Sequence, residues 1–407
     1  MSIEFKKQTL SNGLTIIAEC NDEAHTSAVG YFVKTGARDE ERPIMGVSHF
    51  LEHMMFKGTL RGRTGEDVNR EFDEIGANYN AFTSHEMTVF YAHVLPEYLP
   101  RAIDLLGDML RPALRDSDFD MEKNVILEEI GMYEDRPQWR LQDTLLEHFY
   151  NQHPLSFRVL GTSDTIKALR VEQMRDYFGQ RYGADHITVA AAGRIDFDTL
   201  VGDVEKLAGD WPRAQATRSY DPPSVSYSQK AVADAKLNRH YVAAICPAPS
   251  AQDPRRYAAM ILTDVLGDAD GSRLYWALID PGLADEASFM FEPQDHTGAY
   301  VAFASCDPER AAEVEAKLLE TIDVYAQNID TGEIDRAKHK IATNITVHGE
   351  RPLGRMNNLG GTWAYLAQYT PLEIELERIM AVTPDNVRQL IQDLPLNPRT
   401  IVRLGPK

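Results

Sequence analysis

The chain has 407 residues, of which 43% are hydrophobic and 26% are charged, and its formal net charge at pH 7 is −20. This length and apolar content allow substantial cores, most naturally in two or more domains. The negative charge argues against nucleic acid as a partner. It would attract basic polypeptides if it lined a cavity, and otherwise it serves solubility.

The N-terminal sequence MSIEFKKQTLSNGLTII has neither the apolar core of a secretion signal nor the Arg- and Ser-rich character of a mitochondrial presequence. No apolar run reaches the length of a membrane-spanning helix, so no membrane partner is expected. The cysteines, Cys20, Cys246 and Cys306, are few and odd in number, which favours a reducing compartment over disulfide architecture. We therefore expect a cytoplasmic protein.

The first segment with a chemical signature is HFLEH, residues 49–53, in an apolar helical run that ends at Gly58. On a helix, His49 and His53 project from one face, close enough to share a metal ion, and Glu52 lies on the same side. Neutral imidazoles suit zinc, and a catalytic zinc takes three protein ligands and a water, for which Glu52 is the candidate base. The order inverts the familiar His-Glu-x-x-His motif.

The alternative is an accidental match, which a chain of this composition produces at roughly a few per cent. Isolated histidines on a core-facing helix are usually satisfied core residues. Two histidines at metal spacing, with a glutamate between them, are much harder to bury without a metal.

A third ligand is expected on a helix predicted over residues 120–135, where Glu122, Ile126, Glu129 and Tyr133 fall on one stripe. Two carboxylates thus share a surface with residues that normally pack in a core. Buried carboxylates are costly unless they are paired or bound to metal. The alternative is a solvated face with ordinary surface glutamates.

These blocks resemble the M16 peptidases, the inverted-zinc group that includes pitrilysin, insulin-degrading enzyme and the mitochondrial processing peptidase. The family's His-x-x-Glu-His falls on His49, Glu52 and His53, and its distal glutamate falls on Glu129, with the adjacent Glu128 as the alternative. The resemblance implies that His49, His53 and Glu129 hold one Zn²⁺ per chain. It also implies that Glu52 takes a proton from water and delivers it to the leaving amine.

Two further features of the family have counterparts here. An additional glutamate falls on Glu122, where it would orient a zinc-binding histidine. Residues 76–88, GANYNAFTSHEMT, match a glycine-to-Asn-Ala-x-Thr block that leads into a strand-like segment, and in relatives this strand is a sheet edge beside the zinc. An edge strand accepts an extended peptide through main-chain hydrogen bonds. Asn80, Ala81 and Phe82 are therefore substrate-binding candidates: Asn80 would hold a backbone group, and Phe82 would line a side-chain pocket or else pack in the core.

The sequence also repeats itself. VFYAHVLPEYLPRAIDLLGDML, from Val89, and AFASCDPERAAEVEAKLLETI, from Ala302, share a strand, a proline-bearing turn and an amphipathic helix. Aligning Pro96 with Pro308 gives an offset of 212 residues, which divides the chain nearly in half. The expected fold class is α+β, with two homologous halves that are each an antiparallel sheet covered by helices.

The predicted domains are a zinc-bearing catalytic half at 1–215, a proline-rich linker at 216–230 and a related half at 231–407. With the same offset, residues 49–53 map onto residues 261–265, whose sequence is ILTDV. The second half therefore cannot bind this zinc through equivalent residues.

In relatives, the second half often carries an arginine and a nearby tyrosine that helps to stabilise the tetrahedral intermediate. Here Ile279 and Asp285 stand at those places, unless one deleted residue near Pro281 shifts the register. An oxyanion donor is worth roughly 10²–10³ in rate, and a hydrolase seldom omits it. The resemblance therefore implies a heterodimer, in which this chain bears the zinc and a related non-zinc M16 subunit supplies the pair. A homodimer is the alternative.

The sequence thus predicts a zinc metalloendopeptidase that acts on peptides or unstructured polypeptides. The competing prediction is a non-catalytic M16-like scaffold subunit of a larger complex, since core subunits of respiratory complexes share the fold. Such relatives commonly lose zinc-site residues, whereas the set is complete here. Phosphoryl and hydride transfer have no support, because the chain contains neither a GxxxxGK(S/T) loop nor a GxGxxG fingerprint.

Overall fold

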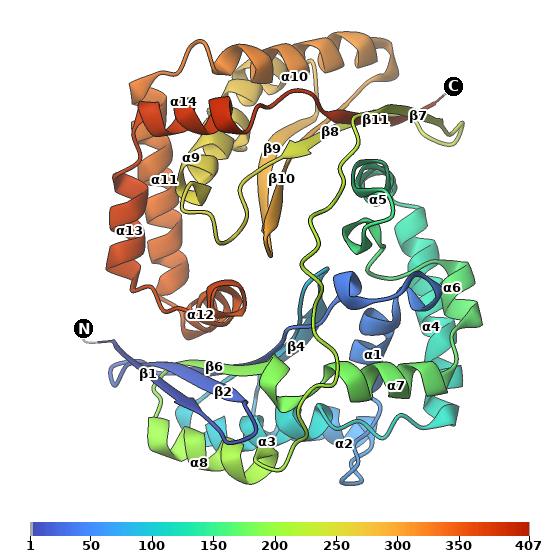
Figure 1. Ribbon diagram of the computed structural model, residues 1–407, viewed down its shortest axis with the longest axis vertical. Helices are drawn as coiled ribbons and strands as arrows, with labels where there is room; N and C mark the ends of the chain where they lie inside the picture. Colours follow the sequence, from blue (N-terminus) through green and yellow to red (C-terminus); the bar gives the residue numbers. More distant parts are fainter. Residues whose placement is uncertain (1–2, 407) are drawn as a thin grey trace. The chain divides into compact units, whose positions relative to one another are not determined.

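The computed structural model describes residues 3–406 of the chain. These residues form two compact units, each assembled from three stretches of sequence. Unit 1 comprises the chain up to Met132, Phe157–Ser219 and Val347–Tyr369, and unit 2 comprises Tyr133–Ser156, Tyr220–Thr346 and the chain from Thr370. Figure 1 shows both units, with colours that follow the sequence.

Unit 1 is built on a six-stranded mixed sheet with the strand order β1-β2-β6-β3-β5-β4. The central strands are buried on both faces, which explains why their sequences are continuous apolar runs. The strand β4 pairs only with β5 and forms one edge of the sheet. The bounds are β1 (Glu4–Thr9), β2 (Thr15–Cys20), β3 (Ser27–Val33), β4 (Asn78–Thr83), β5 (Thr88–Val94) and β6 (Ile187–Gly193).

Most helices of unit 1 cover one face of this sheet, where they enclose the larger core. Fully buried side chains such as Tyr31, Phe50, Phe72 and Phe90 fill it. These helices are α1 (Val47–Met55), α2 (Gly65–Glu74), α3 (Leu99–Met109), α4 (Asp116–Glu134), α6 (Ser163–Ala168), α7 (Val171–Arg181) and α8 (Phe197–Ala208).

A single helix from late in the chain, α12 (Pro352–Leu366), packs on the opposite face (Figure 1). It lies so close to β3 that a Cβ on Gly360 would be 2.2 Å from the Phe32 ring, so this position requires glycine. The buried guanidinium of Arg355 forms an ion pair with Glu19 of β2. These contacts fix the helix to the sheet of unit 1.

Unit 2 is built on a five-stranded sheet with the order β7-β11-β8-β10-β9. The helix α5, from the first half of the sequence, covers one face, and helices of the second half cover the other. The strands are β7 (Gln229–Ala233), β8 (His240–Pro247), β9 (Glu286–Gln294), β10 (Thr297–Cys306) and β11 (Thr400–Gly405). The helices are α5 (Pro137–Tyr150), α9 (Arg256–Gly267), α10 (Ala311–Tyr325), α11 (Thr331–Gly349), α13 (Leu372–Met380) and α14 (Pro384–Asp393).

The two units repeat one topology, which confirms the predicted fold class. The order β2-β6-β3-β5-β4 in unit 1 corresponds to β7-β11-β8-β10-β9 in unit 2. The short 3-10 turns at Pro96–Tyr98 and Pro308–Arg310, which precede α3 and α10, lie 212 residues apart, as the sequence alignment requires. Each sheet departs from the antiparallel prediction at one pair, because β2 and β6, and likewise β7 and β11, run parallel. Two neighbouring parallel strands must be joined by a long crossover connection, and here most of each half of the chain forms that connection.

The compact units are not the sequential halves of the chain, since α5 and α12 are exchanged between them. The predicted boundaries at 1–215, 216–230 and 231–407 therefore describe the sequence repeat, not the spatial units. The passage from unit 1 to unit 2 between Ser219 and Tyr220 falls inside the predicted linker, in a stretch without regular secondary structure.

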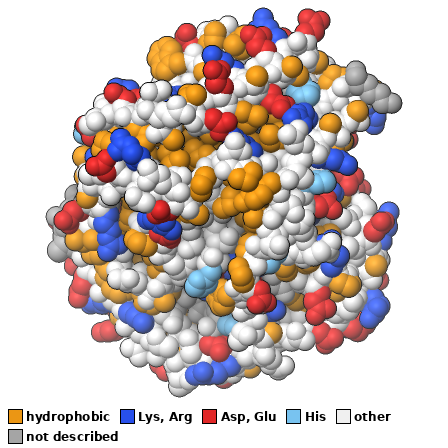
Figure 2. Space-filling view, turned by 45° about the horizontal axis from the view of Figure 1, so that its top comes forward, with side chains coloured by type: hydrophobic (Ala, Val, Ile, Leu, Met, Phe, Trp, Pro, Cys, Tyr) orange, Lys and Arg blue, Asp and Glu red, His pale blue; other side chains and the backbone are white. Residues whose placement is uncertain are grey.

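None of the helices in the described part of the chain combines the length and apolarity that crossing a bilayer requires. On the face drawn in Figure 2, acidic and basic side chains are interspersed and do not gather into fields of one sign.

Candidate active site

Helix α1 carries the two histidines, and the preceding loop fixes where it begins. Gly46 has a φ of 95°, and a Cβ there would lie 2.6 Å from the carbonyl oxygen of Leu160. The buried Glu40 carboxylate accepts hydrogen bonds from the backbone N–H groups of Gly46 (2.7 Å) and Ser48 (2.8 Å). It thereby satisfies N–H groups at the positive end of the helix. The face toward the core is apolar: Val47, Phe50, Leu51 and Met54.

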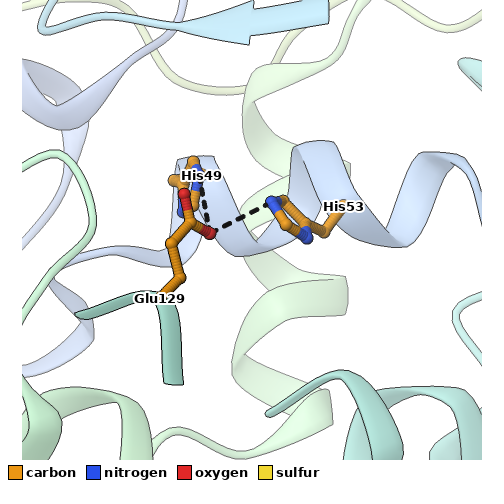
Figure 3. A group of neighbouring side chains, drawn as sticks. All are labelled: His49, His53 and Glu129. Carbon is orange, nitrogen blue, oxygen red and sulfur yellow. Dashed lines mark ion pairs between the residues drawn. The ribbon is translucent and has the colours of Figure 1, made fainter. Parts of the chain in front are cut away.

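On the other side of α1, three predicted ligands converge (Figure 3). The Nε2 atom of His49 lies 3.7 Å from Oε2 of Glu129, and Nε2 of His53 lies 3.5 Å from the same oxygen. Glu129 reaches them from α4. Among residues 3–406, these three form the group whose ligand atoms, all within 4.8 Å of one another, could hold a metal ion.

The donor set fits zinc. Ligands about 2.1 Å from a tetrahedral ion lie about 3.4 Å apart, close to the separations of 3.7 Å and 3.5 Å found here. Burial, reinforced by His53, lowers the pKa of His49 to about 3, so this imidazole is neutral. Burial also raises the pKa of Glu129, against the opposing charge of His53. Ring nitrogens and a carboxylate directed at one point leave a place for a cation.

Glu122 lies behind His53, where the sequence placed a supporting residue. Its Oε1 atom is 2.9 Å from Nδ1 of His53, and its Oε2 atom is 2.7 Å from Nζ of Lys57. A proton on Nδ1 that is donated to Glu122 leaves the lone pair of Nε2 directed toward Glu129. Burial alone would raise the pKa of Glu122 and lower that of His53. The hydrogen bonds and charges of this cluster reverse both shifts.

Glu128, the alternative ligand, is exposed to solvent, while Glu129 is half-buried. The same face of α4 carries Glu122, Ile126 and Ile130, which are buried. The helical stripe predicted from the sequence is therefore the face that meets α1.

Glu52, the candidate base, receives a hydrogen bond of 2.6 Å from Oγ1 of Thr83 on β4. Burial raises the pKa of Glu52, and this hydrogen bond opposes the shift. The sequence reasoning missed Thr83 and Lys57 as members of the site. Thr83 is the threonine of the Asn-Ala-x-Thr block, so a signal for it was present, whereas the role of Lys57 depends on a contact between distant helices.

The substrate-binding candidates lie on the edge strand β4. The strand-like segment that the sequence predicted around residues 76–88 is a hairpin of two strands, with β4 at the edge and β5 inside the sheet. Phe82 is 42% exposed, so the alternative that it packs in the core is wrong. Ala81 packs against the core, while Asn80 and Phe82 alternate with it and face the other way.

Ile279 and Asp285, which stand where relatives carry the arginine and the tyrosine, offer no donor to an oxyanion. Ile279 ends a π-helical turn and packs against the apolar core of unit 2. The carboxylate of Asp285 pairs with Arg239.

Comparisons with known proteins find matches to both halves of the chain. Residues 15–163 match the family model described as Insulinase (Peptidase family M16), and residues 168–341 match the Peptidase M16 inactive domain. An uncharacterized zinc protease of Streptomyces coelicolor is 30% identical over 98% of this chain and 89% of its own length. An uncharacterized zinc protease of Bacillus subtilis is 29% identical over 96% of this chain and 95% of its own.

Solved structures share the fold across the whole chain. A protease from Helicobacter pylori superposes with a TM-score of 0.92 at 17% identity, covering 99% of this chain and 100% of that one. A peptidase M16 inactive domain from Pseudomonas fluorescens gives a TM-score of 0.90 at 16% identity, covering 100% of this chain and 98% of that one. Sequence and fold together show that the chain belongs to the M16 family of peptidases.

Proposed function

We propose that this chain is a zinc-dependent endopeptidase that hydrolyses peptides or unstructured polypeptides. The observation that carries the proposal is the convergence of His49, His53 and Glu129 beside the half-buried carboxyl group of Glu52, which lies on the same helix as the two histidines. The zinc proteases among its relatives support both the metal and the class of reaction.

His49, His53 and Glu129 would hold the ion, which when bound polarises the scissile carbonyl and acidifies water. Glu52 accepts the proton of the attacking water and delivers it to the leaving amine. A general base works best when its pKa lies near the working pH, and burial moves the pKa of Glu52 in that direction. The Thr83 hydroxyl holds one carboxylate oxygen, so the other is left for the proton.

The substrate backbone would add to the free edge of β4, the strand that also carries Thr83. Main-chain pairing of this kind tolerates many sequences, which suits an enzyme for unstructured chains. Asn80 and Ala81 would pair with the substrate backbone, and the exposed ring of Phe82 would contact a substrate side chain.

We further propose that a related subunit without the zinc motif supplies the arginine and tyrosine that Ile279 and Asp285 replace here. A donor supplied in trans stabilises the transition state alone, so the partner should raise kcat by about 10²–10³ and change KM little. Steady-state kinetics of the single chain and of the reconstituted complex would test this. Full activity from the pure single chain would contradict the two-subunit arrangement and leave a self-sufficient monomer or homodimer.

The test of the proposed function is Glu52→Gln in the full chain, assayed with its partner if one co-purifies. Glutamine keeps the size of the side chain but cannot take a proton, so peptide hydrolysis should fall by roughly 10²–10⁴-fold. The bound zinc should be unchanged, because Glu52 is not a ligand. The matched control is Glu66→Gln, an exposed glutamate in the first turn of α2. Near-normal turnover of Glu52→Gln would contradict the proposal. A zinc-loaded wild type that cleaves nothing would favour the scaffold alternative.

A further inference from the structure

Unit 2 contains a cavity of about 250 Å³ that belongs to no part of the site described above. It lies between helix α5 and the sheet, at the side where β9 forms the sheet edge. Its walls are mostly apolar, with a few polar groups on β9 and α5. The residues that shape it are Trp139, Leu145, Met290, Glu292, Val301 and Phe303.

Two hydrogen bonds join α5 to β9, one near each end of the helix. At one end, Nε2 of Gln138 donates a hydrogen bond of 2.9 Å to Glu286. At the other, the Tyr150 hydroxyl donates a hydrogen bond of 3.0 Å to Gln294. Between these two contacts, the helix and the edge strand leave a space that is open to solvent.

The register of β9 determines what faces this space. Met290 pairs with Val301, and Glu292 pairs with Ala299, on the face of the sheet that α5 covers. Alternation along the strand therefore directs Glu286, Ser288, Met290 and Glu292 toward α5. Met290 is 45% exposed and Trp139 is 42% exposed, so the cavity presents apolar surface that a ligand could cover.

Glu292 is the chemically distinctive group in the cavity. Its carboxylate forms no hydrogen bond or ion pair with any other residue between 3 and 406. It is half-buried, and burial raises its pKa. A cation that enters the cavity would stabilise the charged form of this partly buried carboxyl group. By contrast, Glu286 is exposed and already accepts a hydrogen bond from Gln138.

The counterpart of β9 in unit 1 is the edge strand β4, whose sequence NYNAFT contains no acidic residue. The combination of an unpaired carboxylate with apolar walls is thus found on β9 of unit 2 and is not shared by the equivalent strand of unit 1.

We propose that this cavity binds the side chain of a lysine or arginine in a polypeptide, with the alkyl stem against Met290 and Trp139 and the cationic group at Glu292. The cavity thereby selects polypeptides with basic residues. The polypeptide nature of the ligand rests on the proposed function, while the preference for a cation with an apolar stem rests on the cavity alone. Long basic side chains match it because their stems are apolar and only their tips are charged.

The test measures binding, not cleavage. The probes are two acetylated, amidated pentapeptides of alanine, with either lysine or norleucine at the centre. They are titrated into the full-length Glu52→Gln chain, and the fluorescence of Trp139 reports occupancy, with Trp139→Phe identifying that signal among the four tryptophans of the chain. We expect the lysine peptide to bind about tenfold more tightly than the norleucine peptide. A difference of this size corresponds to one charge-assisted hydrogen bond.

Glu292→Gln should remove the preference for lysine and leave the weaker binding of the norleucine peptide unchanged. The matched control, Glu147→Gln, an exposed glutamate on α5 that does not line the cavity, should keep the preference. Thermal unfolding of both variants verifies that they fold. Equal binding of the two peptides to the parent chain, or a preference that survives in Glu292→Gln, would overturn the inference. Neither result would touch the proposed hydrolysis, which the turnover and zinc content of Glu52→Gln test separately.

Discussion

Helices α1 and α9 occupy the same place in the two units, yet only α1 presents a metal site. The positions of His49 and His53 correspond to Ile261 and Val265 in α9, which are 0% and 5% exposed and belong to the core of unit 2. In unit 2, the positions equivalent to His49 and His53 are therefore ordinary core positions. Histidines stand there in unit 1 because Glu122 and Glu129 of α4 contact them. The residues at the corresponding positions of α11 are Ile334 and Ile341, which pack in the core of unit 2.

The position of Glu52, the fourth residue of the motif at 49–53, differs less between α1 and α9. The counterpart of Glu52 is Asp264, and burial raises the pKa of both carboxyl groups. A half-buried carboxyl group on this helix is thus common to both units, while the ligand set is particular to unit 1. The comparison teaches that the metal site depends on α4 as much as on the histidine motif.

The largest effect is expected from removing the ligand that α4 contributes. Glu129→Gln should lose zinc and peptide hydrolysis together, because an amide oxygen is a much weaker ligand than a carboxylate. Glu128→Gln, one residue away and exposed, should keep both. Metal analysis and turnover of the two variants would check this. Loss of zinc from Glu128→Gln alone would move the ligand by one residue and discard the assignment of the helical face.

A smaller effect is expected from the residue behind His53. Glu122→Gln keeps the size of the side chain but weakens the hydrogen bond that fixes the His53 ring. Zinc affinity should fall by about 10–100-fold, as measured by competition with a chelator of known affinity. A variant that binds zinc as tightly as the wild type would show that the contact from Glu122 does not support the His53 ring as a ligand.

The smallest effect concerns the counterpart carboxyl group in unit 2. Burial and the nearby Asp268 raise the pKa of Asp264 to about 6, against the opposing charge of Lys340. A carboxyl group whose folded pKa lies above its unfolded value stabilises the fold when protonated, and that contribution is lost as the pH rises through about 6. Asp264→Asn should therefore be more stable than the wild type at pH 8 by on the order of 1 kcal/mol, and lose this advantage at pH 4. Chemical denaturation at the two pH values measures it. An identical difference at both would contradict the assigned pKa.

The features that sequence reasoning predicted well depend on local spacing. The histidines four residues apart and the glutamate stripe from Glu122 to Glu129 each lie on one helix, so the helical period alone places them on one face. The repeat was visible for a related reason, because the turns at Pro96 and Pro308 carry their proline signal in the sequence.

The features that could not be predicted depend on contacts between distant segments. The exchange of α5 and α12 leaves no trace in local composition, because an amphipathic helix does not specify which sheet it covers. The parallel pairing of β2 with β6 joins residues far apart in sequence. The same holds for the hydrogen bond from Thr83 to Glu52, and for the cavity beside Glu292, which depends on how α5 meets β9.

The most direct test of the central claim is to give α1 the core residues of α9. The double variant His49→Ile, His53→Val copies the residues found at 261 and 265, and zinc per chain is counted after dialysis against metal-free buffer. We predict about one zinc per wild-type chain, as for a single site with three protein ligands. The variant should hold none, while its thermal unfolding remains cooperative. Equal zinc in the two proteins would contradict the assignment of the site to α1 and α4.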